Sequence, residues 1–144
     1  ISGASDNTFL VDLPDGKWGQ SKSQKALAAA AADIEAQGKT AVVLLADSHQ
    51  AGTALTVHRH TPFDAVLIDG DHTLAGVTRD WKLYGSMADV VAFHDIDGTG
   101  VTAKRGGYPV EVPKLWDSLK RGHKGEIHEF IAPGSKMGIG VLCE

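Results

Sequence analysis

The sequence is poor in the features that mark extracellular, nucleic-acid-binding or membrane-spanning proteins. Its single cysteine, Cys143, excludes an internal disulfide and fits a reducing compartment. A formal charge of −4 and an aromatic content of 6% argue against a nucleic-acid surface, which is normally basic and often carries stacking rings. The apolar runs are far shorter than the ~20 residues that a membrane span needs. Residues 1–7 have neither the basic nor the apolar region of a signal peptide. These absences predict a cytoplasmic protein without nucleic-acid or membrane partners.

What remains is the composition of an ordinary globular domain. Hydrophobic residues make up 42% and charged residues 22% of 144 residues, enough for one domain, 1–144, with its own core. Short apolar runs predict strands, and periodic or Ala-rich segments between them predict helices. The predicted strands are 8–12, 41–45, 63–68, 90–93, 126–131 and 138–142, and the predicted helices are 23–37, 49–60, 74–85 and 113–121. This alternation predicts an α/β fold with a mostly parallel sheet and a C-terminal antiparallel hairpin.

The most informative stretch is the strand predicted at 63–68 together with the polar residues that follow it. The apolar run stops at Asp69, Asp71 and His72. In open α/β sheets, ligands bind just beyond the carboxyl ends of the strands. Carboxylates and an imidazole there suit a divalent cation, and an imidazole that titrates near neutrality suits proton abstraction. The competing interpretation is that Asp71 caps the next helix and that His72 is a solvated loop residue.

The strand predicted at 90–93 ends in the same way, with His94 and Asp95. Successive parallel strands are usually neighbours, so their ends come within reach of each other. We therefore predict that Asp69 and Asp95 share one cation, with His94 as a further candidate ligand. The alternative is an Asp-Ile-Asp loop that is simply solvated.

Acids also follow the first two predicted strands. Asp12 lies where acids of nucleotide-binding sheets receive ribose hydroxyls. Asp47 and Ser48 follow the second strand, where they either contact a base edge or cap the following helix.

With these residues assembled, the chain resembles the class I S-adenosylmethionine-dependent methyltransferases. It is most similar to the branch of cephalosporin-hydroxylase-like proteins and sugar or macrolide O-methyltransferases. The most specific part is DGDH followed by a helix, then FHD and a terminal GIGV strand. The similar segments cover most of the chain in the family's order: VDLPDGKWG (11–19), LADSH (45–49), FDAVLIDGDHTLAGVTRDWKLY (63–84), VVAFHDI (90–96), VPKLW (112–116) and GIGVL (138–142).

The resemblance implies a Rossmann-like three-layer sandwich that transfers a methyl group from S-adenosylmethionine to a hydroxyl of a small substrate, a saccharide or natural product. It implies that Asp12 binds the cofactor ribose and that Asp47 and Ser48 lie beside the adenine. It implies that Asp69 and Asp95 bind Mg²⁺ or another divalent cation, with Asp69 also next to the cofactor and the reacting centre. His72 matches the candidate base. His94 stands where metal-dependent members often carry an acid.

One family feature has no counterpart, namely a first strand that ends in a Gly-rich turn. Gly3 is the only glycine before Gly16. The resemblance places that strand between those at 8–12 and 63–68, so its loss would expose two apolar strand edges. Either the chain is a fragment without its upstream residues, or it fills the gap by pairing with another copy as a homo-oligomer. The fragment is favoured because unpaired buried backbone is costly.

Two other functions compete with methyl transfer. A non-catalytic relic that serves as a binding or oligomerisation module is favoured by the missing turn and opposed by the acids at successive strand ends. A metal-dependent hydrolase would use the same histidines and aspartates, but no third strand end supplies an obvious further ligand.

Overall fold

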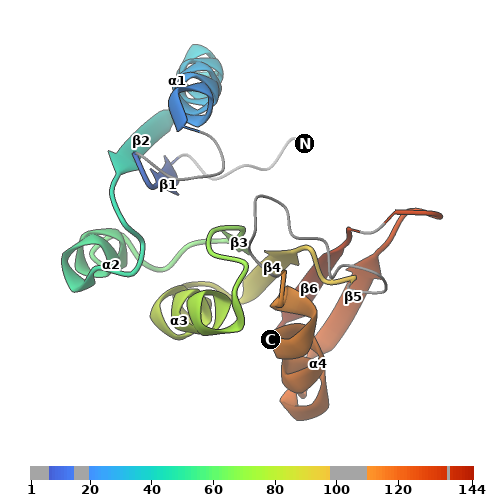
Figure 1. Cartoon of the computed structure of the whole chain (residues 1–144). Helices are drawn as coiled ribbons and strands as arrows, with labels where there is room; N and C mark the ends of the chain where they lie inside the picture. Colours follow the sequence, from blue (N-terminus) through green and yellow to red (C-terminus); the bar gives the residue numbers. More distant parts are fainter. Residues whose placement is uncertain (1–6, 15–19, 98–109, 136) are drawn as a thin grey trace. The chain divides into compact units, whose positions relative to one another are not determined.

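A computed structural model of the chain describes residues 7–14, 20–97, 110–135 and 137–144. Helices and strands alternate along it, which confirms the predicted α/β class (Figure 1). The elements in chain order are β1 (Asn7–Asp12), α1 (Gln20–Ala36), β2 (Thr40–Leu45), α2 (Ala51–His58), β3 (Val66–Ile68), α3 (Leu74–Tyr84), η1 (Gly85–Met87), β4 (Val90–His94), α4 (Val112–Gly122), β5 (Glu126–Phe130) and β6 (Ile139–Cys143). Gly3, Gly16 and the end of the segment at 11–19 lie outside the described residues.

The chain divides into two compact units, residues 1–60 and 61–144. The described strands correspondingly form two sheets, β1–β2 in the first unit and β3–β4–β6–β5 in the second. The sequence predicts a mostly parallel sheet without its first strand, whereas the larger of the two observed sheets is mixed, with one parallel and two antiparallel pairings. Within the described residues, β1 ends one sheet and β3 ends the other.

The first unit is built on a parallel strand pair covered by an Ala-rich helix. β1 and β2 run parallel from Asn7 opposite Thr40 to Asp12 opposite Leu45. The N–H of Ala46 donates to the carbonyl of Asp12 over 2.9 Å and extends the pairing by one residue. Because the strands are parallel, Asp12 and the residues after β2 reach the same edge of this small sheet.

The second unit contains the mixed sheet. β3 runs parallel to β4, while β6 is antiparallel to both β4 and β5, which confirms the C-terminal hairpin. The register pairs Ile68 with Phe93. The residues that follow these two, Asp69 and His94, therefore lie next to each other at the ends of β3 and β4.

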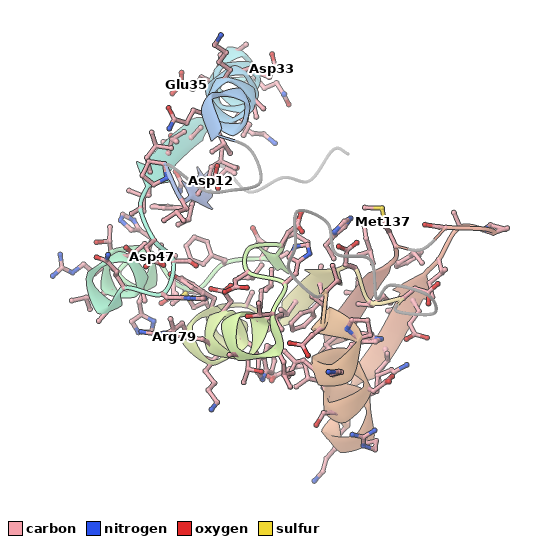
Figure 2. The ribbon with its side chains drawn as sticks, viewed as in Figure 1. Asp12, Asp33, Glu35, Asp47, Arg79 and Met137 are labelled. Carbon is pink, nitrogen blue, oxygen red and sulfur yellow. The ribbon has the colours of Figure 1, made fainter. Side chains whose placement is uncertain are left out.

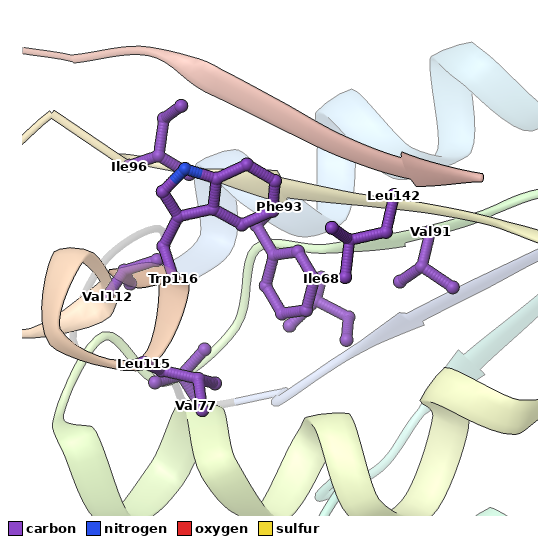
Figure 3. Packing of buried hydrophobic residues seen from close by; sticks show 9 residues of the cluster. All are labelled: Ile68, Val77, Val91, Phe93, Ile96, Val112, Leu115, Trp116 and Leu142. Carbon is purple, nitrogen blue, oxygen red and sulfur yellow. The ribbon is translucent and has the colours of Figure 1, made fainter. Parts of the chain in front are cut away.

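The core of the second unit fixes the ends of β3 and β4. Helices α3 and α4 pack side chains against one face of the sheet (Figure 3). Phe93 and Trp116 are 0% and 1% exposed, and their ring centroids lie 5.8 Å apart. A Cβ at residue 140 would collide with the Trp116 indole, so Gly140 is required for this packing. The cluster contains Ile68, Val77, Val91, Phe93, Ile96, Val112, Leu115, Trp116 and Leu142.

Several boundaries differ from the prediction. The strand predicted at 63–68 is regular only from Val66, and Phe63 makes an isolated bridge with Ala88 instead. The helix predicted at 49–60 is shorter, because a turn occupies the residues before Ala51. Among the described residues, no helix combines the length and apolar composition needed to cross a bilayer.

Candidate metal-binding site

Four side chains converge at the carboxyl ends of β3 and β4. Asp69 directly follows β3 and His72 lies three residues on, while His94 is the last residue of β4 and Asp95 follows it. We call these four residues the Asp/His cluster. The parallel register of β3 and β4 brings them together, as predicted for neighbouring strands.

In the Asp/His cluster each imidazole lies between the two carboxylates. His72 Nε2 is 3.1 Å from Asp69 Oδ1, and His72 Nδ1 is 3.0 Å from Asp95 Oδ2. His94 Nδ1 is 3.2 Å from Asp69 Oδ1 and 3.3 Å from Asp95 Oδ1. The Asp69 side chain is 45% exposed and that of Asp95 only 6%, so the cluster has a solvent side and a buried side.

These residues fit a divalent cation. Asp69, His72 and His94 each offer a ligand atom, and these atoms lie within 4.8 Å of one another. Among the described residues, His94 Nδ1 and Asp95 Oδ1 are shielded from solvent and have no hydrogen-bond partner, although they lie 3.3 Å apart. Buried polar atoms without a hydrogen-bond partner destabilise the folded state, and a bound cation would interact with both of these atoms. Mixed imidazole and carboxylate donors suit borderline metals such as Zn²⁺ as well as Mn²⁺.

The backbone at Asp95 is held in a sparsely populated conformation. Its φ of 61° lies in the left-handed region, which aspartate tolerates better than most non-glycine residues. The neighbouring Ile96 anchors it, since Ile96 is buried in the core and its N–H donates to the carbonyl of Gly138 over 3.3 Å. Strain of this kind persists where the surroundings over-determine it, often at functional sites. Here it turns the Asp95 carboxylate toward His72.

The carboxylates raise the pKa of His72. The largest cause is its hydrogen bond to Asp69; burial opposes the rise, and the charge of Asp95 adds to it. The folded state favours the protonated imidazole, so protonated His72 adds to the free energy of unfolding. This contribution is largest below pH 6.5, the pKa of the imidazole in the unfolded state. That contribution is lost as pH rises through the higher pKa of the folded state.

We therefore expect His72→Gln to destabilise the metal-free protein more at about pH 5.5 than at about pH 8.5. The measurement is urea unfolding in the presence of a chelator at both pH values. His128→Gln on β5 is the control, because His128 lies outside the cluster and faces Glu126 at 3.3 Å. A pH-independent loss in His72→Gln would contradict the assignment.

Asp71 supports the residue that caps the next helix. Its Oδ1 accepts the N–H of Thr73 over 2.9 Å, and Thr73 Oγ1 in turn accepts the N–H of Gly76 over 3.1 Å at the start of α3. Thr73, rather than Asp71, is therefore the N-cap residue of α3.

The candidate cofactor residues of the first unit follow its two strands: Asp12 ends β1, and Asp47 and Ser48 lie between β2 and α2 (Asp12 and Asp47 are labelled in Figure 2). Asp12 Oδ1 accepts the N–H of Leu13 over 2.9 Å, while its Oδ2 is shielded and has no hydrogen-bond partner in the described part of the chain. Asp47 accepts the N–H of His49 through Oδ1 and that of Gln50 through its carbonyl. Asp47 and Ser48 thus form the turn before α2, whose N-cap residue is Gln50.

Glu111 is a residue that the sequence did not single out. It immediately precedes α4, and its backbone N–H donates to the carbonyl of His72 over 2.7 Å. Its side chain accepts the N–H of Leu74 across a separation of 37 residues. No local pattern signals a contact of this kind, because it depends on how α3 and α4 pack.

Comparison with known proteins adds no family assignment. No protein-family model matches the sequence, and a search of curated proteins found no similar sequence.

Proposed function

We propose that this chain is an S-adenosylmethionine-dependent methyltransferase domain that O-methylates a small hydroxylated substrate with the help of a divalent metal ion. The substrate class implied by the resemblance is a saccharide or natural product. The observation that carries the proposal is the convergence of Asp69, His72, His94 and Asp95 at two neighbouring strand ends. The three-layer Rossmann-like sandwich is the finer fold that belongs to it.

The residues of the cluster divide the work between metal binding and proton transfer. Asp69, His94 and Asp95 would hold the metal, since His94 Nδ1 lies within 3.3 Å of a carboxylate oxygen of each aspartate. His72 would accept the substrate hydroxyl proton at Nε2, which faces the more exposed carboxylate. Its Nδ1–H would donate to Asp95, which orients the ring and stabilises its protonated form. When bound, the metal lowers the pKa of the hydroxyl and the cofactor supplies the methyl of its sulfonium.

The first unit supports the cofactor part of the proposal. The shielded Oδ2 of Asp12 needs a donor, and a ribose hydroxyl supplies one. Asp47 and Ser48 would lie beside the adenine, at the turn that follows the neighbouring strand.

The test is calorimetric titration of the chain with S-adenosylmethionine, with and without Mg²⁺ or Mn²⁺. We expect binding that Asp12→Ala weakens and that Asp33→Ala, a matched exposed acid on α1, leaves unchanged. Absence of heat at high micromolar cofactor would refute the methyltransferase assignment for this chain and leave the non-catalytic binding module. Equal binding by Asp12→Ala and the unsubstituted chain would refute the ribose contact.

The variant His72→Gln distinguishes two possible roles of His72, that of a base and that of a metal ligand. If His72 is the base, His72→Gln retains metal binding and loses methyl transfer. If His72 is a ligand, the same variant loses affinity for the metal. Metal titration followed by radiolabelled methyl transfer to a panel of sugars distinguishes the two.

A metal-dependent hydrolase is the second candidate, because the cluster contains two imidazoles rather than carboxylates alone. That donor set suits Zn²⁺, which activates water at neutral pH. Zn²⁺-dependent cleavage of p-nitrophenyl esters or phosphates without S-adenosylmethionine, lost in His94→Ala, would favour hydrolysis. Methyl transfer that requires the cofactor would exclude it as the main activity.

A further inference from the structure

Glu111, the residue that precedes α4, hydrogen-bonds the loop that carries His72. This loop, residues 69–73, connects β3 to α3, and Asp69 at its start is fixed by the pairing of Ile68 with Phe93. His72 lies near its far end. There Glu111 contacts the chain on both sides of residue 73: its N–H donates to the His72 carbonyl over 2.7 Å, and its Oε2 accepts the Leu74 N–H over 3.0 Å.

The Leu74 contact also satisfies a group that a helix leaves unpaired. The first backbone N–H groups of a helix have no partner within it. At the start of α3, the Thr73 N–H donates to Asp71 Oδ1 and the Gly76 N–H donates to Thr73 Oγ1, so both acceptors are local side chains. The Leu74 N–H donates instead to Glu111 Oε2, and Glu111 is the residue that precedes α4. A carboxylate in this position also interacts favourably with the helix dipole.

Glu111 is in turn held by its own helix. Lys114 Nζ lies 2.6 Å from Glu111 Oε1, which leaves Oε2 directed to Leu74. The hydrogen bond from Lys114, followed by that from Leu74, holds the pKa of Glu111 below its ordinary value. The carboxylate is therefore charged across the neutral pH range and permanently available as an acceptor.

We infer that Glu111 is a positioning residue of the Asp/His cluster, which sets the place of His72 by binding its carbonyl and the N–H of Leu74. This inference rests on the proposed metal site, with His72 as one of its ligands beside Asp69 and His94. Asp95 directly follows β4, so the 3.0 Å separation between its Oδ2 and His72 Nδ1 depends on where the loop is held. Without the Glu111 carboxylate, the end of the loop that carries His72 is less restrained than the end that carries Asp69. Groups outside the ligand sphere that orient ligands typically change metal affinity by ~10–100-fold.

The experiment titrates Co²⁺ into the unsubstituted chain and its variants and follows the visible absorption of the bound metal. Glu111→Ala is expected to weaken binding by about tenfold or more. Glu111→Gln should restore most of the affinity, because its amide oxygen still accepts the Leu74 N–H. Lys114→Ala, which leaves that bond intact, and Glu126→Ala, which removes an exposed glutamate on β5, should bind as the unsubstituted chain does. Equal affinities in Glu111→Ala and Glu126→Ala would overturn the inference.

A second measurement needs no metal and separates this inference from the proposed function. In the chelated protein, the ring nitrogen chemical shifts of His72 should move in Glu111→Ala and stay unchanged in Glu126→Ala. The Leu74 amide of the unsubstituted chain should be protected from hydrogen exchange, although first-turn amides ordinarily are not. If the unsubstituted chain fails to bind Co²⁺, the metal site fails, and the His72 shifts still decide the role of Glu111. Unchanged His72 shifts together with a rapidly exchanging Leu74 amide would reject it.

Discussion

Replacement of His94 by alanine is expected to lower the affinity of the chain for Co²⁺ or Mn²⁺ by more than ~100-fold, the upper end of what loss of an outer-sphere group costs. The reason is geometric. His94 Nδ1 lies within 3.3 Å of an oxygen of both Asp69 and Asp95, so its removal leaves two carboxylates without the donor between them. It also removes a buried nitrogen that lacks a hydrogen-bond partner among the described residues. Isothermal titration of the chelated and dialysed protein measures the change directly.

The matched control for this prediction is His128→Ala. His128 is also a histidine on a strand of the same sheet, but it faces Glu126 on β5 and takes no part in the cluster. The two variants should therefore differ by about 100-fold or more in metal affinity, a difference of about 2.8 kcal/mol. Equal losses, or no loss in either, would mean that the metal binds elsewhere or not at all.

Replacement of Trp116 by alanine is expected to destabilise the second unit by about 3–5 kcal/mol, a large share of the ~5–15 kcal/mol that stabilises a typical domain. Trp116 is 1% exposed and packs against Phe93 at a ring centroid separation of 5.8 Å. Its indole also occupies the space that Gly140 leaves open, so an alanine would leave a cavity bounded by α4 and β6. Urea unfolding followed by circular dichroism measures the loss.

Trp81→Ala is the control for the core substitution. The rings of Trp81 and Phe93 are separated by 5.6 Å, close to the Trp116 distance, but Trp81 is only partly buried and lies at the margin of the core. Its loss should cost clearly less, because less apolar area leaves the core. Equal costs would show that ring contact with Phe93, rather than burial, determines the contribution. Trp116→Ala should also weaken metal binding, since Phe93 directly precedes His94 on β4.

The local sequence predicted the elements and the Asp/His cluster better than it predicted the sheet. Four acidic or imidazole side chains at the ends of two apolar runs were enough to predict a cluster, because parallel neighbours end at the same edge. Asp71 was left between two interpretations, and the residue that caps α3 is its neighbour Thr73, whose N–H Asp71 accepts. The mostly parallel sheet was inferred from alternation, and alternation does not specify which strands are hydrogen-bonded to each other. That pairing depends on backbone contacts between distant segments.

By itself, the sequence determined the α/β class, the C-terminal hairpin and the residues at the strand ends, because apolar periodicity and turn residues are local properties. Only the tertiary structure decided how those residues meet. The pairing of Ile68 with Phe93 sets Asp69 beside His94, and the left-handed backbone at Asp95 turns its carboxylate toward His72. The packing of α3 and α4 brings Glu111 to the loop at His72. Strand register and helix packing join residues far apart in the chain, so no local pattern encodes them.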